Sequence, residues 1–198
     1  MSHADLASIG PAMSITGSER TRVLLDLSTR QYNVNVFQAL LTMLLETETH
    51  IQADPADVFA FFAEMEENYE AWHRDHITFR WVEGEPLEEG TRAYFEEEIG
   101  GKVMKKTVKY VTVESNRHIQ LKPTSRMMGF FLPFITFTID PAKDGCVFTQ
   151  QIKIRTGPIG KRLNRVEFAA VHEHMKEEGE NLKLLMENGR ESAAARSG

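Results

Sequence analysis

His174 and Glu178 stand four residues apart in the run from Phe168 to Met186, where apolar residues recur at helical spacing. In a helix, side chains at positions i and i+4 lie one above the other on the same face. A neutral imidazole and a carboxylate are both ligands for a divalent metal ion, so this pair supplies half of a tetrahedral site. The remaining ligands must come from elsewhere in the fold.

A third candidate is Glu97, which lies in a segment that alternates like a strand, from Thr91 to Ile99. Period-two alternation places Glu97 on the same face as the apolar residues of that segment. A buried carboxylate must be paired, hydrogen-bonded, protonated or metal-bound. If Gly100-Gly101 is a two-residue turn, Glu97 lies opposite Met104, and Lys106 faces the same side. The carboxylate therefore has two alternative partners, a metal ion or Lys106.

The fourth candidate is one of two histidines, His73 and His76, in the segment Trp72-His-Arg-Asp-His76. This segment is expected to be the loop between a short helix and the first long strand, at the mouth of a cavity. Asp75 is placed to orient either ring by accepting its second N–H. His76 is preferred because it directly precedes the strand.

The elements that must position these residues form an α+β pattern. A strand over 49–52 precedes Asp54-Pro55, a helix N-cap followed by proline at the first helical position. Two short helices are followed by alternating segments that predict an antiparallel meander over 77–83, 91–99, 103–113, 118–122, 134–139 and 147–154. One long helix over 159–188 closes the pattern, and Gly189 marks its end.

A curved sheet around a long helix leaves a cavity between them, where a hydrophobic small molecule binds. The run Met127 to Pro133, apolar but interrupted by glycine, is typical of a cavity entrance. The predicted cavity residues are Trp81, Phe95, Met104, Met128, Phe131, Phe134, Phe137, Val171 and Met175.

The chain is predicted to contain one domain, over 48–190. Residues 1–47 form an N-terminal extension with a short helix over 32–46, and residues 191–198 form a disordered tail. The helix of the extension carries apolar residues on every side, so it is expected to be buried against the domain or a second subunit, as in a homodimer.

Composition excludes several classes of function. The 198 residues are 41% hydrophobic and 26% charged, as in a soluble globular protein, and the net charge of −6 argues against nucleic-acid binding. Cys146 is the only cysteine, which excludes a disulfide within the chain and favours a reducing cytoplasm. No segment has the pattern of a secretion signal or a stable membrane span.

Several motifs carry a resemblance to a known family. The opening Thr49-His-Ile-Gln-Ala-Asp-Pro-Ala-Asp-Val-Phe-Ala-Phe-Phe, the later Glu88-Glu-Gly-Thr-Arg, the segment Asp144-Gly-Cys-Val-Phe-Thr and the closing helix resemble the helix-grip superfamily. It includes START-like, birch-pollen-allergen-like and polyketide cyclase-like proteins (SRPBCC). The resemblance covers about residues 48–188 and implies an α+β fold, in which a curved antiparallel sheet wraps around a long C-terminal helix and encloses a cavity.

A narrower resemblance implies chemistry. Tyr69-Glu-Ala-Trp-His-Arg-Asp-His76 together with His174-xxx-Glu178 is similar to the diacetylphloroglucinol hydrolase and phloretin hydrolase group. Those enzymes use a zinc ion held by two histidines and two glutamates to cleave a carbon–carbon bond beside an aromatic polyketide. The resemblance assigns His174, Glu178, Glu97 and either His76 or His73 as zinc ligands, with Glu97 and His174 in the catalytic centre.

The leading hypothesis is therefore a zinc-dependent hydrolase with a hydrophobic, aromatic or polyketide-like substrate. Two alternatives remain open. One is a metal-free carrier of a lipid or other hydrophobic ligand, in which His174 and Glu178 form an internal hydrogen bond. The other is a metal-free cyclase in which His174 and Glu97 act as general acid and base.

Overall fold

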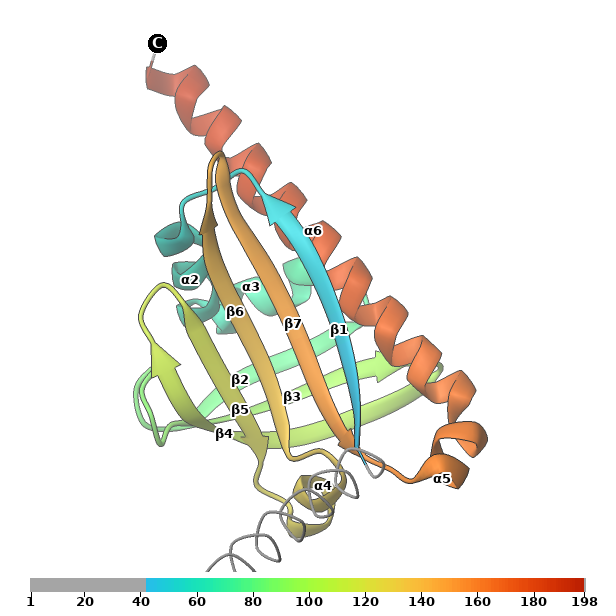
Figure 1. The fold of residues 1–198 in the computed structure, drawn as a ribbon. Coiled ribbons are helices and arrows are strands. Elements are labelled where there is room, and N and C mark those ends of the chain that lie inside the picture. Colours follow the sequence, from blue (N-terminus) through green and yellow to red (C-terminus); the bar gives the residue numbers. More distant parts are fainter. Residues whose placement is uncertain (1–41, 198) are drawn as a thin grey trace, which may run out of the picture. The chain divides into compact units, whose positions relative to one another are not determined.

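The computed structural model describes residues 42–197, with side chains up to residue 189. Its seven strands form one antiparallel sheet in the order β1-β7-β6-β5-β4-β3-β2 (Figure 1). The strands are β1 Thr42–Ile51, β2 His76–Glu83, β3 Arg92–Ile99, β4 Lys102–Glu114, β5 His118–Pro123, β6 Phe134–Ala142 and β7 Gly145–Arg155. The helices are α2 Pro55–Ala63, α3 Met65–Trp72, α4 Arg126–Phe131, α5 Pro158–Leu163 and α6 Arg165–Ser197.

The predicted fold class is confirmed. Strands β2 to β7 follow one another as a meander, β1 closes the sheet beside β7, and the long helix α6 packs against the curved sheet. The N-cap prediction is also confirmed, because the Asp54 side chain accepts a hydrogen bond from the backbone N–H of Ala56 at 2.8 Å, with Pro55 at the first helical position.

Strand β1 corrects one prediction. It begins at Thr42, so the last part of the predicted helix over 32–46 is extended, and the remainder lies outside the described residues. Along β1 partly exposed and exposed residues alternate, with Leu45 turned toward the domain and Leu44 53% exposed. This period of two, which starts before residue 48, belongs to a strand rather than a helix.

The C-terminal helix also differs from the prediction. Asn164 separates α5 from α6, and α6 continues past Gly189 to Ser197, so the residues predicted as a disordered tail are helical through Ser197. Glycine costs only about 1 kcal/mol in a helix interior, and the alanine-rich residues that follow are strong helix formers. None of the helices between residues 42 and 197 is long and apolar enough to cross a bilayer.

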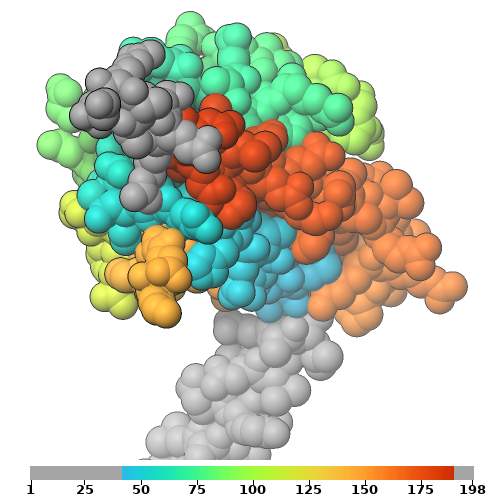
Figure 2. Space-filling model, turned by 90° about the horizontal axis from the view of Figure 1, so that it is seen from above, coloured from blue at the N-terminus to red at the C-terminus, as the bar shows by residue number. Residues whose placement is uncertain are grey.

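In the space-filling view, α6 runs between β1 on one side and the region of α3 and β2 on the other (Figure 2). Gly179 permits the close approach to β1, since a Cβ at this position would lie 2.3 Å from Oγ1 of Thr49. On the other side, the Trp72 indole N–H donates to the backbone carbonyl of Glu178 at 2.9 Å. Helix α6 is therefore fixed against both α3 and β1 at the level of Glu178.

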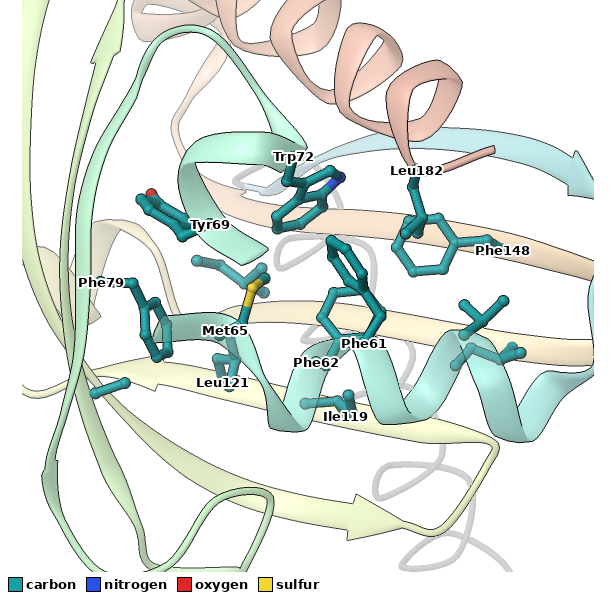
Figure 3. Packing of buried hydrophobic residues seen from close by; sticks show 14 of the residues in the cluster. Phe61, Phe62, Met65, Tyr69, Trp72, Phe79, Ile119, Leu121, Phe148 and Leu182 are labelled. Atoms are coloured by element: carbon teal, nitrogen blue, oxygen red, sulfur yellow. The ribbon is translucent and has the colours of Figure 1, made fainter. Parts of the chain in front are cut away.

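Aromatic residues form the core between the short helices and the sheet (Figure 3). The Phe62 ring stacks on Phe148 of β7 with centroids 5.6 Å apart, and the Trp72 ring meets Phe62 edge-on at 5.5 Å. Leu182 of α6 is fully buried in the same cluster. Each such side chain contributes about 1.5–3 kcal/mol by leaving water. This packing holds α3, and with it the start of β2, in a fixed place.

Candidate metal and ligand site

A cavity of about 500 Å³ lies between the inner face of the sheet and α6. Its wall is mainly apolar, with a few polar side chains that include Tyr69, Glu97, Lys106, His174 and Glu178. This volume and this mixture are typical of sites for small hydrophobic molecules.

The cavity wall contains all of the predicted cavity residues except Trp81 and Phe134. Phe134 pairs with the exposed Lys153, and alternation along β6 turns it away from Phe137 and the cavity. Trp81 packs with its ring centroid 5.0 Å from Phe79 and 5.2 Å from Tyr110, outside the cavity wall.

Four of the predicted ligand residues lie together and are buried. His76 begins β2 opposite Glu97 of β3, while His174 and Glu178 come from α6. One nitrogen or oxygen atom of each residue lies within 4.8 Å of the corresponding atoms of the other three. Oε1 of Glu178 is 3.0 Å from Nε2 of His76 and 3.6 Å from Nε2 of His174.

The hydrogen bonds of His76 determine which of its nitrogens faces this cluster. Nδ1 lies 2.8 Å from the backbone carbonyl of Tyr69, which can only accept a hydrogen bond. Nδ1 therefore carries the proton, and in a neutral ring Nε2 presents a lone pair to the carboxylate of Glu178 at 3.0 Å. Two acceptors then face each other, an arrangement that requires either a proton on one of the two groups or a cation between them.

His174 adds a ring nitrogen without a hydrogen-bond partner. Its Nε2 is buried and has no hydrogen-bond partner among the described residues. Burial lowers the pKa of His174 below its ordinary value, although Glu178 and Glu97 oppose this effect, so the ring is neutral at pH 7.

Glu97 is held from two sides. Burial opposes its ionisation, but the Lys106 ammonium, which donates to Oε1, and the nearby His174 and His76 hold the pKa of Glu97 below its usual range. The Tyr69 hydroxyl donates to the other oxygen, Oε2, at 3.1 Å, and burial raises the pKa of Tyr69 above its usual value. The ion pair with Lys106 that the sequence offered as an alternative is thus present.

His73 is buried next to the cluster rather than exposed at a cavity mouth, and the same correction applies to His76. Nδ1 of His73 accepts from the backbone N–H of Asp75 at 3.1 Å, and Nε2 donates to Glu177 at 2.9 Å. The Asp75 carboxylate, 4.0 Å away, does not orient the ring as predicted. Although a ring nitrogen of His73 lies within 4.8 Å of those of His76 and His174, both of its nitrogens already have partners.

Sequence reasoning gave no role to Tyr69, whose carbonyl and hydroxyl contact two of the four residues. The available signal was its position seven residues before His76, in the helix α3 that ends at Trp72. Lys106 was recognised as a neighbour of Glu97 but not as a residue of the cavity wall.

A family model described as "Polyketide cyclase / dehydrase and lipid transport" matches residues 43–187. The chain belongs to this family. The description names reactions and transport of hydrophobic molecules, in agreement with the apolar cavity, and the chain accordingly binds a hydrophobic small molecule. No curated protein matched the chain significantly.

Solved structures show the same fold. The major latex-like protein 151 from Panax ginseng is 15% identical with a TM-score of 0.59, and the match covers 74% of this chain and 98% of that one. The KanY protein (ms6282) is 20% identical with a TM-score of 0.58, with the same coverages. The protein TTHA0849 from Thermus thermophilus is 14% identical with a TM-score of 0.60, covering 74% of this chain and 99% of its own. At these identities the likeness shows the fold alone.

Proposed function

We propose that this family member is a zinc-dependent hydrolase that cleaves a carbon–carbon bond beside a carbonyl group in an aromatic or polyketide-like ligand. His76, Glu97, His174 and Glu178 hold the metal ion. The observation that carries the proposal is the contact between Nε2 of His76 and Oε1 of Glu178, because the only N–H of a neutral His76 ring already donates to the Tyr69 carbonyl.

The donor set fits zinc in chemistry and in spacing. Two imidazole nitrogens and two carboxylates are ordinary zinc ligands, and ligand atoms placed tetrahedrally about 2.1 Å from zinc lie about 3.4 Å apart. The distances of 3.0 and 3.6 Å from Glu178 to the two histidines lie on either side of that value. The Tyr69 carbonyl accepts the N–H of His76 Nδ1 and so leaves Nε2 free to bind a metal ion, as backbone carbonyls often do for metal-binding histidines.

The metal ion, the cavity wall and the polar side chains have separate roles in the proposed reaction. A bound zinc ion polarises a carbonyl group and lowers the pKa of water. The apolar wall orients the ligand and excludes water from its ring. Glu97, kept ionised by Lys106, would serve as a zinc ligand, and Tyr69 and Lys106 donate hydrogen bonds to its two oxygens. These two donors also give Glu97 partners other than a metal ion, so of the four ligands it would be the one that leaves a bound ion most readily.

One observation favours a second candidate, a metal-free protein that binds a hydrophobic ligand. The buried ion pair between Lys106 and Glu97 already neutralises this carboxylate without a metal ion. A metal-free cyclase that uses Glu97 and His174 as acid and base belongs with this candidate, and its turnover would survive chelation.

Elemental analysis of untagged protein tests the proposal. We expect about one zinc per chain in the wild type and a loss of zinc in both His174→Ala and Glu178→Ala. His172→Ala is the matched control, because His172 is exposed on the same helix. Absence of zinc from the wild type, even after zinc is added, would favour the metal-free candidate.

A further inference from the structure

Helix α4, helix α5 and the start of α6 lie at one end of the sheet (Figure 1), and residues of α4 and of the start of α6 line the cavity. Three large apolar residues mark the opening because they line the cavity and are also exposed: Met104 at 37%, Phe131 at 55% and Val166 at 77%. The first lies beside the turn between β3 and β4, the second in α4 and the third at the start of α6. Contacts join the rim, since Lys102 lies 3.6 Å from Glu167, and Arg155 lies over the Phe130 ring at 5.7 Å.

The rim is apolar and exposed to an unusual degree. Met127 of α4 is 75% exposed, Ile159 and Leu163 of α5 are 76% and 75% exposed, and Phe130 is 59% exposed. Isolated exposed apolar residues are ordinary, but many large ones at one end of the molecule, on α4, α5 and the start of α6, are typical of a binding surface. We call these residues, together with Phe131 and Val166, the rim surface.

Basic residues border the rim surface, although the protein as a whole carries a net negative charge. The chain carries a net charge of −6, yet residues 145–166, which lead through α5 to the start of α6, contain no Asp or Glu, and α4 contains none either. Glu167, which follows Val166, lies 3.6 Å from Lys102. The basic residues of 145–166 are Lys153, Arg155, Lys161, Arg162 and Arg165. Arg162 and Arg165 are exposed and have no carboxylate within 4.0 Å among the described residues.

We infer that the rim surface docks on an anionic lipid bilayer. Exposed large apolar side chains flanked by lysine and arginine suit the boundary between acyl chains and negatively charged headgroups, where apolar burial and electrostatic attraction add. A bilayer is also a phase in which hydrophobic molecules dissolve, so docking places the cavity opening against the source of its ligand. This inference does not depend on a metal ion or on the proposed reaction.

Vesicle co-sedimentation of the full chain tests the inference. The probes are phosphatidylcholine vesicles with and without ~30% phosphatidylserine, and we expect roughly tenfold stronger binding to the anionic vesicles at low salt, reduced at high salt. Arg162→Glu/Arg165→Glu should abolish this preference. Arg117→Glu/Lys143→Glu is the matched control, because it makes the same charge change in turns at the other end of the sheet and should retain binding.

The apolar contribution has its own variant, Ile159→Ser/Leu163→Ser, which should weaken binding to anionic vesicles while thermal melting stays unchanged, since both side chains are exposed. Equal binding to both kinds of vesicle, no binding, or equal loss in the two charge variants would overturn the inference. A different result would identify the rim surface as an interface between copies of the chain. In that case the wild type does not bind vesicles, and light scattering shows a dimer for the wild type and a monomer for this apolar variant.

Discussion

Replacing Glu178 by glutamine separates the two explanations of the His76 contact. If a neutral His76 presents a lone pair to Glu178 at 3.0 Å, the glutamine amide can donate to that nitrogen instead. One new neutral hydrogen bond contributes about 1 kcal/mol, and removal of a buried charge acts in the same direction. Without zinc, Glu178→Gln should therefore raise the free energy of unfolding by about 1–2 kcal/mol and the melting temperature by about 2–8 °C.

With zinc bound, the wild type should become more stable than Glu178→Gln. At a free concentration about 100 times Kd, zinc stabilises the wild type by about 2.7 kcal/mol, or roughly 5–10 °C. The variant has lost one of four ligands and should not respond. Thermal unfolding of both proteins, with chelator and with zinc, provides the assay. If Glu178→Gln destabilises the chelated protein, His76 carries two protons and forms an ion pair with Glu178, and the reasoning from two facing acceptors is wrong.

Other predictions concern buried groups. Lys106→Met leaves Glu97 without its cation and should destabilise the zinc-free protein by about 3 kcal/mol in urea unfolding, whereas the double variant Lys106→Met/Glu97→Gln should recover most of this loss. Unchanged stability of the zinc-free Lys106→Met variant would contradict the ion-pair account. Burial, reinforced by Asp54, raises the pKa of the Cys146 thiol, so a disulfide reagent at pH 8 should label the native protein only as fast as it unfolds. Rapid labelling of folded protein would show that Cys146 is accessible.

Local periodicity was sufficient to predict most of the candidate site. The helical period brought His174 and Glu178 to one face, and the strand period with the turn at Gly100 placed Glu97 opposite Met104, as the register shows. The same rule, applied strictly, would have separated Phe134 from Phe137, because residues three apart in a strand face opposite sides.

What could not be predicted depends on tertiary contacts. His73 and His76 lie in one short segment, and only the positions of the Tyr69 carbonyl and of Glu177 determine which ring nitrogen each presents. The start of β1 was misread because its leucines fit a buried helix as well as a strand. Pairing with β7, which lies about a hundred residues later in the sequence, decides in favour of the strand.

The pairing of β1 with β7 also affects how the protein acquires its site. Thr42 lies opposite Arg155, and the four clustered residues come from β2, β3 and α6, so neither the closed sheet nor the cluster forms from sequence neighbours. Contacts of such long range form slowly and late in folding. An ion that needs the completed cluster would then be absent from the transition state, and would lengthen the lifetime of the folded protein without speeding its formation.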